Sequence, residues 1–287
     1  MMIRKSFAKI NFYLEVTGRE NDYHLLNSLM AFLDIYDEIE FKKSESLKLE
    51  IKGQYADFLK NDPHENIIIR TVKILSDEYQ FDPKIKISLT KNIPIGAGIG
   101  GGSSNAATTL LMLNEFYNLK ISKQKLAEIG LKLGADVPFC LNQKMALISG
   151  IGENITDIEI ATKPLFAIII NPNIHLSTKE VFKNFAKNNQ PFSDLKLGDI
   201  SAKNFISTIK NHKNDLEKYA IELAPEISQI LIEIAKQNNC LVSRMSGSGS
   251  TCFGLFDNQN DLSFAYQNLS RKFPGFYLRK SEILFRL

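Results

Sequence analysis

A dense run of glycines at residues 96–102 is the feature that most constrains how this chain folds. It lies in the stretch PIGAGIGGGSSNAATT, at residues 94–109, between an alternating apolar segment and an apolar helical pattern. Glycine allows a positive φ and a close approach of the backbone to a ligand. The first N–H groups of a helix and its dipole favour an anion. We therefore predict a phosphate-binding loop, because an ordinary strand-to-helix turn does not require so many glycines.

Two other nucleotide-binding motifs are excluded by the context of this loop. Gly96, Gly98 and Gly101 match G-x-G-x-x-G, but a dinucleotide-binding unit requires a second strand that ends in an acidic residue. A second helical pattern, SKQKLAEIGLKLG, stands there instead. No lysine follows the glycines in the order G-K-S/T, so the loop is not a P-loop. A nicotinamide-dependent oxidoreductase is accordingly disfavoured.

Length, charge and cysteine content narrow the class of protein. A chain of 287 residues with 44% hydrophobic residues predicts two domains with sizeable cores. The net charge of +3 is spread along the chain without a basic block, so neither a nucleic acid nor a membrane surface is expected as a partner. Cys140, Cys240 and Cys252 are an odd number and far apart, which indicates neither disulfides nor zinc. We expect an unexported protein of the reducing cytoplasm.

Apolar periodicity predicts the elements of the first half of the chain. A strand with one buried face is expected over 10–16, followed by a turn in TGREND and another strand region from Tyr23. Asp136 follows a helix and precedes Pro138, which should prevent the helix from resuming, so the carboxylate would lie on a rigid turn. The other expected elements are strands over 47–53, 84–90 and 145–156 and helices over 61–80, 103–117 and 122–134.

The second half reads as a separate strand-and-helix domain, with its boundary after residue 160. A polar, irregular segment is expected over 188–201, and a glycine-rich connection, MSGSGST, should join two strands. Further expected elements are strands over 164–173 and 275–284, helices over 177–187 and 261–273, and other helices that end near residue 239. His64, His175 and His212 have no paired spacing and are expected to be surface residues.

The glycine loop resembles the second motif of the GHMP kinases, and the resemblance extends along the chain. The similar stretches, in the order and spacing of that family, are FAKINFYLEVTGR, YHLLNSLM, ENIIIRTV, IPIGAGIGGGSSNAAT, LGADVPFCL, TKEVF and RMSGSGSTCF. The resemblance implies an α+β, two-domain GHMP kinase fold with substrate in the cleft between the domains. Residues 1–160 would form a ribosomal-protein-S5-like domain, and residues 161–287 a ferredoxin-like domain.

The same resemblance implies roles for individual residues. Lys9 and Asp136 would be the catalytic pair, although a strand lysine and a turn aspartate are more often structural. Ser103 and Ser104 could cap the helix, approach Mg²⁺ or both. The residues implied in ATP binding are Asn66, Pro94, Ile95, Gly96, Ala97, Gly98, Ile99, Gly100, Gly101, Gly102, Ser103 and Ser104.

A cytidine pocket is implied by Asn11, Tyr23, His24 and Phe182, with the rings of Tyr23 and Phe182 stacking on cytosine. Ordinary core packing is the competing interpretation for Phe182. The family usually has Asp-Gly-Tyr-His where this chain has Asn-Asp-Tyr-His at residues 21–24, so the turn is one residue shorter. The segment SGSGS at residues 246–250 resembles the third motif of the family, which closes over the active site.

The activity implied is ATP- and Mg²⁺-dependent phosphorylation of a cytidyl-linked alcohol in non-mevalonate isoprenoid biosynthesis. The family implies a monomer or weak homodimer, and the sequence does not indicate the metal ligands. Another small-alcohol kinase, such as homoserine or mevalonate kinase, would share the glycine loop but not the cytidine pocket. A nucleotide-binding regulator without turnover is a further alternative, which the pairing of Lys9 with Asp136 disfavours.

Overall fold

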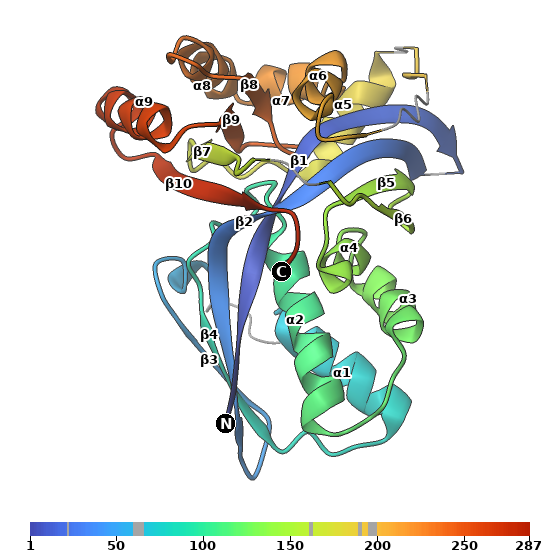
Figure 1. Ribbon diagram of the computed structural model, residues 1–287. Coiled ribbons are helices and arrows are strands. Elements are labelled where there is room, and N and C mark those ends of the chain that lie inside the picture. Colours follow the sequence, from blue (N-terminus) through green and yellow to red (C-terminus); the bar gives the residue numbers. More distant parts are fainter. Residues whose placement is uncertain (22, 60–65, 161–162, 189–190, 195–199) are drawn as a thin grey trace. The chain divides into compact units, whose positions relative to one another are not determined.

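The computed structural model describes residues 1–287 except 22, 60–65, 161–162, 189–190 and 195–199 (Figure 1). The described chain forms two compact units that interleave in sequence. Unit 1 comprises Met1–Lys9, Ile35–Ile95 and Gly100–Gln143, and unit 2 comprises Ile10–Asp34, Gly96–Ile99 and Lys144–Leu287. The boundary that we expected after residue 160 stays a prediction. None of the helices in the described ranges has the length and apolar content that spanning a membrane requires.

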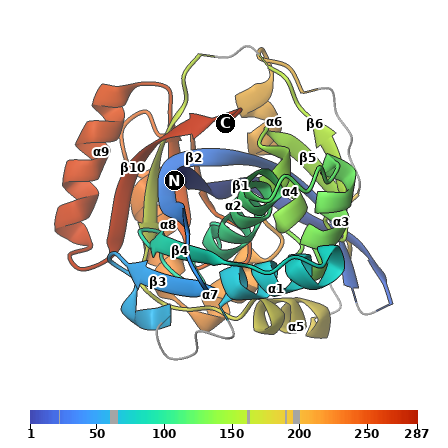
Figure 2. The ribbon, with the colours of Figure 1, turned by 90° about the horizontal axis from the view of Figure 1, so that it is seen from below.

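Unit 1 combines a sheet with four helices. The second part of β2 pairs antiparallel with β4, which pairs in parallel with β3. Helix α2 contacts the other three helices, as Figure 2 shows. The elements are β1 (Met2–Glu20) and β2 (Tyr23–Lys43), which both continue into unit 2, β3 (Lys48–Lys52), a 3₁₀ turn (Asp57–Leu59), α1 (Ile67–Tyr79), β4 (Ile85–Thr90), α2 (Gly101–Phe116), α3 (Lys123–Leu133) and α4 (Val137–Asn142).

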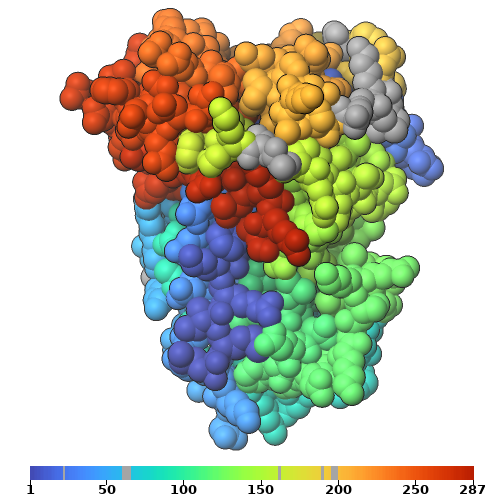
Figure 3. Space-filling model, viewed as in Figure 1, coloured from blue at the N-terminus to red at the C-terminus, as the bar shows by residue number. Residues whose placement is uncertain are grey.

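The limits of these helices follow from capping and burial. The side chain of Asn66 accepts a hydrogen bond from the N–H of Ile68 and caps α1, and Ser122 caps α3 in the same way. Helix α2 is buried on almost every side from Ser104 to Leu110, which is typical of a central helix. Arg4 of β1 forms an ion pair with Glu115 of α2. The blue N-terminal residues and the green helical residues of unit 1 accordingly adjoin on the surface in Figure 3.

Unit 2 is built on an antiparallel sheet. Strand β10 pairs with β7 and with the first part of β2, β7 pairs with β9, and β9 pairs with β8. The first part of β2 also pairs with β5, which forms a hairpin with β6. The elements are β5 (Ala146–Gly150), β6 (Asn154–Asp157), β7 (Phe166–Asn171), α5 (Thr178–Lys187), α6 (Phe205–Asn211), α7 (Glu217–Leu223), α8 (Glu226–Ala235), β8 (Val242–Met245), β9 (Cys252–Phe256), α9 (Gln259–Lys272) and β10 (Tyr277–Leu284).

The core of unit 2 lies between this sheet and its helices. Ile168 and Ile170 of β7 pack in one apolar cluster with Val181 of α5, Ile230 of α8 and Leu269 of α9. Strand β7 is buried along nearly its whole length, as its continuous apolar sequence AIII suggests. Burial of this cluster is the main stabilising contribution to unit 2.

Strand β1 differs from the strand that we expected in this region. It begins at Met2, and it is buried on both faces from Ala8 to Val16 rather than on one. The polar residues Lys9 and Asn11 are also buried, because each has a polar partner inside the protein. The alternation of polar and apolar residues therefore predicted the strand correctly, but the prediction that only one of its faces is buried was wrong.

Three other expectations on the elements need correction. The region 145–156 is the hairpin of β5 and β6 instead of one strand. Gly150 at the end of β5 and Gly152 in the turn both have a positive φ. Pro138 does not prevent a helix, because it stands in the first turn of α4, where a proline is tolerated. Helix α2 begins at Gly101, two residues earlier than predicted. The expected start of α1 at residue 61 lies outside the described residues.

Candidate functional site

The two residues predicted to be catalytic lie together in unit 1. The Nζ atom of Lys9, on β1, is 3.1 Å from Oδ2 of Asp136, which directly precedes α4. The Lys9 side chain is only 4% exposed, whereas that of Asp136 is 33% exposed. A buried ammonium requires an anionic partner, and Asp136 provides it. One side of this carboxylate remains open to a ligand, so the pair can hold a charge and also accept a proton.

The start of α2 packs directly on the side chain of Lys9. Gly100 caps the helix with φ +67°, and a Cβ atom at this position would lie 2.6 Å from Cγ of Lys9. Only glycine fits here without displacing the lysine. The predicted capping role of Ser103 and Ser104 is wrong, because Gly100 is the cap and both serines lie within the helix. Ser104 is buried and its Oγ accepts a hydrogen bond from Ser6 Oγ at 3.0 Å.

Residues 96–99 of the glycine loop belong to unit 2, where the segment 246–250 holds them. Gly98 has φ +76°, and a Cβ atom there would lie 2.6 Å from the carbonyl oxygen of Gly249. The hydroxyl of Ser246 donates to the carbonyl of Gly98 at 3.2 Å, and the N–H of Thr251 donates to the carbonyl of Ala97 at 3.2 Å. The two glycine-rich segments are therefore adjacent, which the sequence alone did not establish.

The five glycines serve different purposes. Gly96, Gly98 and Gly100 have positive φ, as expected for a loop that turns sharply. Gly101 and Gly102 lie in the first turn of α2. Gly101 is required by packing, because a Cβ atom would lie 2.8 Å from Cγ2 of Ile93, whereas nothing lies within 4 Å of a Cβ at Gly102.

The other residues predicted to bind ATP differ in exposure. Pro94, Ala97 and Ile99 are buried, whereas Ile95 is exposed. Asn66 is buried at the start of α1, where its side chain is occupied as a helix cap. Contact of these residues with ATP stays a prediction.

Two of the predicted substrate residues stack on each other in unit 2. The rings of His24 and Phe182 are 5.0 Å apart and inclined by 24°, and the edge of Phe185 also meets His24. Burial and the nearby charge of Arg19 lower the pKa of His24, so its imidazole is mainly neutral at pH 7 and can both donate and accept a hydrogen bond. Tyr23, in contrast, is 63% exposed.

Asn11 is fully buried at the point where β1 meets two other segments. Its side-chain amide donates to Ser28 Oγ at 2.8 Å, and its backbone N–H donates to Ser246 Oγ at 3.1 Å. Binding of substrate by Asn11 stays a prediction.

One prediction about the histidines is wrong. His212 is largely buried, with Nδ1 2.9 Å from Oε2 of Glu15 and its ring stacked on Tyr13 at 4.1 Å. A polar partner inside the unit explains why a histidine in a polar sequence is not at the surface. His175 is exposed and lies against Gly96, and His64 lies outside the described residues.

The three cysteines are buried or half-buried thiols. Cys140, Cys240 and Cys252 are free, and burial raises the pKa of each thiol, that of Cys240 to about 11. Within the described part of the chain, no group of three or more His, Cys, Asp or Glu side chains is placed to hold a metal ion.

Sequence reasoning missed a second ion pair in unit 1, between Asp37 of β2 and Lys91 after β4. The Lys91 Nζ atom is 2.5 Å from Asp37 Oδ2, and both side chains are buried. A signal was available in the sequence, since Asp37 lies on the same buried face of its strand as the apolar residues Ile35, Ile39 and Phe41. An acidic residue on such a face indicates an internal partner.

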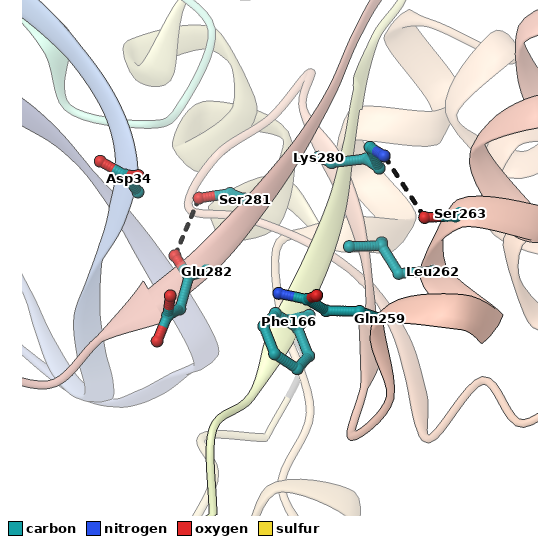
Figure 4. Close-up of a pocket in the computed structure, with 8 residues that line it drawn as sticks. All are labelled: Asp34, Phe166, Gln259, Leu262, Ser263, Lys280, Ser281 and Glu282. Atoms are coloured by element: carbon teal, nitrogen blue, oxygen red, sulfur yellow. Dashed lines mark hydrogen bonds between the residues drawn. The ribbon is translucent and has the colours of Figure 1, made fainter.

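Unit 2 also contains a groove (Figure 4). It has a cavity volume of about 310 Å³ and lies where α9 faces β10, with Asp34 of β2 at one side. Lys280 points toward Ser263, with 3.3 Å between Nζ and Oγ. Every described residue that lines this groove lies outside the predicted site.

Comparison with known proteins identifies the class of this fold. The family model for the GHMP kinases N terminal domain matches residues 66–144, which include the glycine loop and Asp136. The model for the GHMP kinases C terminal domain matches residues 196–275, which include the second glycine-rich segment. The fold class predicted from the sequence, that of the GHMP kinases, is thus confirmed.

Individual relatives narrow the class further. The chain is 36% identical over 282 residues to a 4-diphosphocytidyl-2-C-methyl-D-erythritol kinase from Clostridioides difficile, with coverage of 97% of this chain and 94% of the relative. A crystal structure of 4-(cytidine 5'-diphospho)-2C-methyl-D-erythritol kinase matches with a TM-score of 0.78 and 29% identity, over 98% of this chain and 99% of the other. The chain belongs to the 4-diphosphocytidyl-2-C-methyl-D-erythritol kinase family.

A more distant structure shares the fold only. Homoserine kinase from Cytophaga hutchinsonii matches with a TM-score of 0.72 at 18% identity, over 100% of this chain and 98% of the other. Members of the class that act on different alcohols therefore have the same fold, and the fold does not specify the substrate.

Proposed function

We propose that this chain transfers the γ-phosphoryl group of ATP to the 2-hydroxyl of 4-diphosphocytidyl-2-C-methyl-D-erythritol, a step of non-mevalonate isoprenoid biosynthesis. The observation that carries this proposal is the contact of Lys9 with Asp136 beside Gly100, the glycine that caps α2. Phosphoryl transfer requires positioning and charge stabilisation more than covalent chemistry from the protein. A lysine, a carboxylate and a helix N-terminus supply these requirements.

In the proposed mechanism, Asp136 is the proton acceptor. It takes the proton of the 2-hydroxyl as the hydroxyl oxygen forms its bond to the γ-phosphorus, and the bond from this phosphorus to ADP breaks. Lys9 is buried beneath the carboxylate and stabilises its negative charge. Because Gly100 packs on the methylenes of Lys9, the lysine is held in one position relative to the start of α2.

Residues 94–104 are proposed to bind the phosphates of ATP. The first N–H groups of α2 have no partner within the helix, so they can donate hydrogen bonds to an anion. The positive φ of Gly96, Gly98 and Gly100 supports a loop whose backbone can follow the phosphates. Asn66 is proposed to contact adenine through atoms other than Oδ1, because Oδ1 caps α1.

Mg²⁺ fits the described residues as an ion carried by the nucleotide. Mg²⁺ commonly binds through substrate phosphates, water and one or two protein oxygens, so it does not require a dedicated cluster of acidic side chains. Ser103, half-buried in the first turn of α2, is the proposed protein oxygen, because the Ser104 hydroxyl is bonded to Ser6. When bound, the ion neutralises charge on the phosphates.

The cytidine ring is proposed to bind near His24 and Phe182. Their stacked rings support a flat aromatic site, and the neutral imidazole of His24 can bond the edge of a base. Tyr23 would complete the pocket by placing its exposed ring on the other face of cytosine. The protein would act in the cytoplasm as a monomer or weak homodimer.

The test is ADP release with a panel of alcohols that includes the cytidyl substrate, homoserine and mevalonate. We expect turnover with the cytidyl substrate and at most traces with the other two. Turnover with homoserine or mevalonate alone would replace the proposed substrate by another member of the class. ATP binding without turnover on any alcohol would favour a nucleotide-binding regulator.

A further inference from the structure

The carboxylate of Asp37 is the centre of a buried polar network in unit 1. It is fully buried on β2, and its Oδ2 atom contacts Nζ of Lys91 at 2.5 Å. A buried ion pair contributes little net stability because both charges lose their hydration, but removal of one partner leaves an uncompensated charge. The consequence of this pair therefore lies in the geometry that it fixes more than in net stability.

This carboxylate joins the two ends of the glycine loop. Its Oδ1 atom accepts hydrogen bonds from the backbone N–H groups of Asn92, at 2.6 Å, and Ile93, at 2.9 Å. Its Oδ2 atom accepts a hydrogen bond from the Asn105 side chain at 3.0 Å. Ile93 immediately precedes residues 94–104, and Asn105 immediately follows them. One carboxylate therefore fixes the backbone before the loop and the helix after it.

The first residue of α2 packs on the same network. A Cβ atom at Gly101 would lie 2.8 Å from Cγ2 of Ile93 and 3.2 Å from Nζ of Lys91. The helix start thus lies against the residue before the loop and against the buried ammonium. Charge-assisted hydrogen bonds are short and directional, so the hydrogen bond from Asn105 to Asp37 fixes the position of α2.

We propose that Asp37, Lys91 and Asn105 form a clamp that positions the phosphate-binding loop. They are positioning residues: the Asp37 carboxylate accepts hydrogen bonds from Lys91 Nζ, from Asn105 Nδ2 and from two backbone N–H groups, whereas Oδ1 of Asn105 has no partner among the described residues. Their effect on ATP passes through residues 94–104. The clamp keeps the ends of the loop at a fixed separation, so the N–H groups of α2 are placed for the phosphates before ATP arrives. This inference rests on the proposed binding of ATP by residues 94–104.

The sharpest test removes one hydrogen bond of the clamp and compares it with a matched change in the same helix. Asn105→Ala releases α2 from Asp37 but leaves the ion pair intact. Thr109→Ala truncates a residue that is equally buried, one turn further along α2, and does not touch the clamp. Affinity for a non-hydrolysable ATP analogue is measured by calorimetry, together with the KM for ATP, kcat and the melting temperature.

We expect both variants to melt at a lower temperature, but only Asn105→Ala to bind the nucleotide more weakly. The loss should be about tenfold to hundredfold, the range for losing a hydrogen bond to a charged group. The KM for the cytidyl substrate should change less than about twofold, because sites without shared partners affect each other little. Equal nucleotide affinity in the two variants would overturn the proposal and leave the network a purely structural role.

A second set of variants tests the ion pair itself. Asp37→Asn alone leaves Lys91 unpaired and is expected to fold poorly. The two charges are therefore removed together, by Asp37→Leu with Lys91→Met. In this double variant the leucine neither accepts a hydrogen bond from Asn105 nor donates one to it, and nucleotide affinity should fall at least as far as in Asn105→Ala. Adding Asn105→Ala to the double variant should then produce no further loss, because residues in one network do not act additively.

Additive losses, or wild-type nucleotide affinity in the double variant, would contradict the clamp. The outcome is separate from that of the proposed function. Nucleotide binding is measured without any alcohol, so the clamp is tested even if the cytidyl substrate is not phosphorylated. Conversely, wild-type turnover on that substrate would support the proposed function whether or not the clamp exists.

Discussion

In the described part of unit 1, two buried lysines each form an ion pair with an aspartate, and the two pairs have the same chemistry but different surroundings. In both pairs the lysine side chain is 4% exposed, whereas the aspartate is fully buried in Asp37–Lys91 and 33% exposed in Lys9–Asp136. Asp37 accepts hydrogen bonds from two backbone N–H groups and two side chains. All its acceptor positions serve the protein.

The difference teaches which pair can perform chemistry. A carboxylate that accepts a proton from a substrate must present an oxygen atom to it, and Asp136 is open enough to do so. Asp37 is enclosed and is suited to hold the backbone in place. The exposure of the carboxylate, rather than the type of pair, therefore separates the proposed catalytic residue from the proposed positioning residue.

The largest effect should follow from Asp136→Asn. The amide keeps the shape of the side chain but cannot accept the proton, so kcat should fall by about 10² to 10⁴. Affinity for ATP, measured by calorimetry, should remain close to that of the parent. The free energy of unfolding should fall by less than in a fully enclosed pair, because water can reach the exposed side of Asp136 and replace part of its interaction with Lys9. A variant that keeps more than half of the parental kcat would remove Asp136 from its proposed role.

The enclosed pair should respond in the opposite way. Asp37→Asn leaves the Lys91 ammonium buried without a counter-ion, and we expect a loss of about 3 to 5 kcal/mol in the free energy of unfolding. Chemical denaturation of Asp37→Asn and Asp136→Asn under the same conditions measures the contrast. Equal destabilisation by the two substitutions would mean that exposure does not distinguish the pairs.

The two pairs also show how far the sequence could predict this protein. Lys9 and Asp136 were predicted through their place in family motifs, because nothing in their local sequence indicates that residues 127 positions apart meet. The Asp37–Lys91 pair lies outside those motifs and was missed. The buried face of β2 nevertheless marks Asp37 as unusual.

Local patterns predicted most elements but not how the chain is shared between units. The caps at Asn66, Ser122 and Gly134 define helices that the periodicity had indicated. In contrast, β1 and β2 each contribute to both units, which alternation within a strand cannot reveal. The burial of Lys9, Asn11 and His212 likewise depends on partners from distant parts of the sequence.

Recognition of the base should be independent of both pairs, and Phe182→Ala tests this. Loss of one stacking ring costs about 1 to 3 kcal/mol, so the KM for the cytidyl substrate should rise about 5-fold to 150-fold. The KM for ATP should barely change. Tyr23→Ala should resemble Phe182→Ala, whereas Tyr23→Phe should be mild because the ring remains. If both alanine variants affect ATP and the cytidyl substrate equally, or affect neither, the cytidine pocket lies elsewhere.

The smallest effects should come from three successive glycines at the start of α2, of which the first two each lie against the lysine of one pair. Gly100 packs on Lys9, Gly101 packs on Lys91, and a Cβ atom at Gly102 would meet nothing within 4 Å. Gly100→Ala must adopt a positive φ, which costs about 1 to 2 kcal/mol, and it should also lower kcat by displacing Lys9. Gly101→Ala should lower stability through overpacking against Ile93, by about 1 to 3 kcal/mol, without that strain in φ.

Gly102→Ala is the matched control for these two substitutions. The position is helical and open, so alanine should stabilise the fold by about 0.5 to 1 kcal/mol. Melting temperatures of the three variants without ligands, followed by kcat for each, measure the series. A loss of stability in Gly102→Ala similar to that in Gly100→Ala would show that a Cβ atom is unfavourable here even where the surrounding space is open. The contacts with Lys9 and Lys91 would then not be the reason why glycine stands at positions 100 and 101.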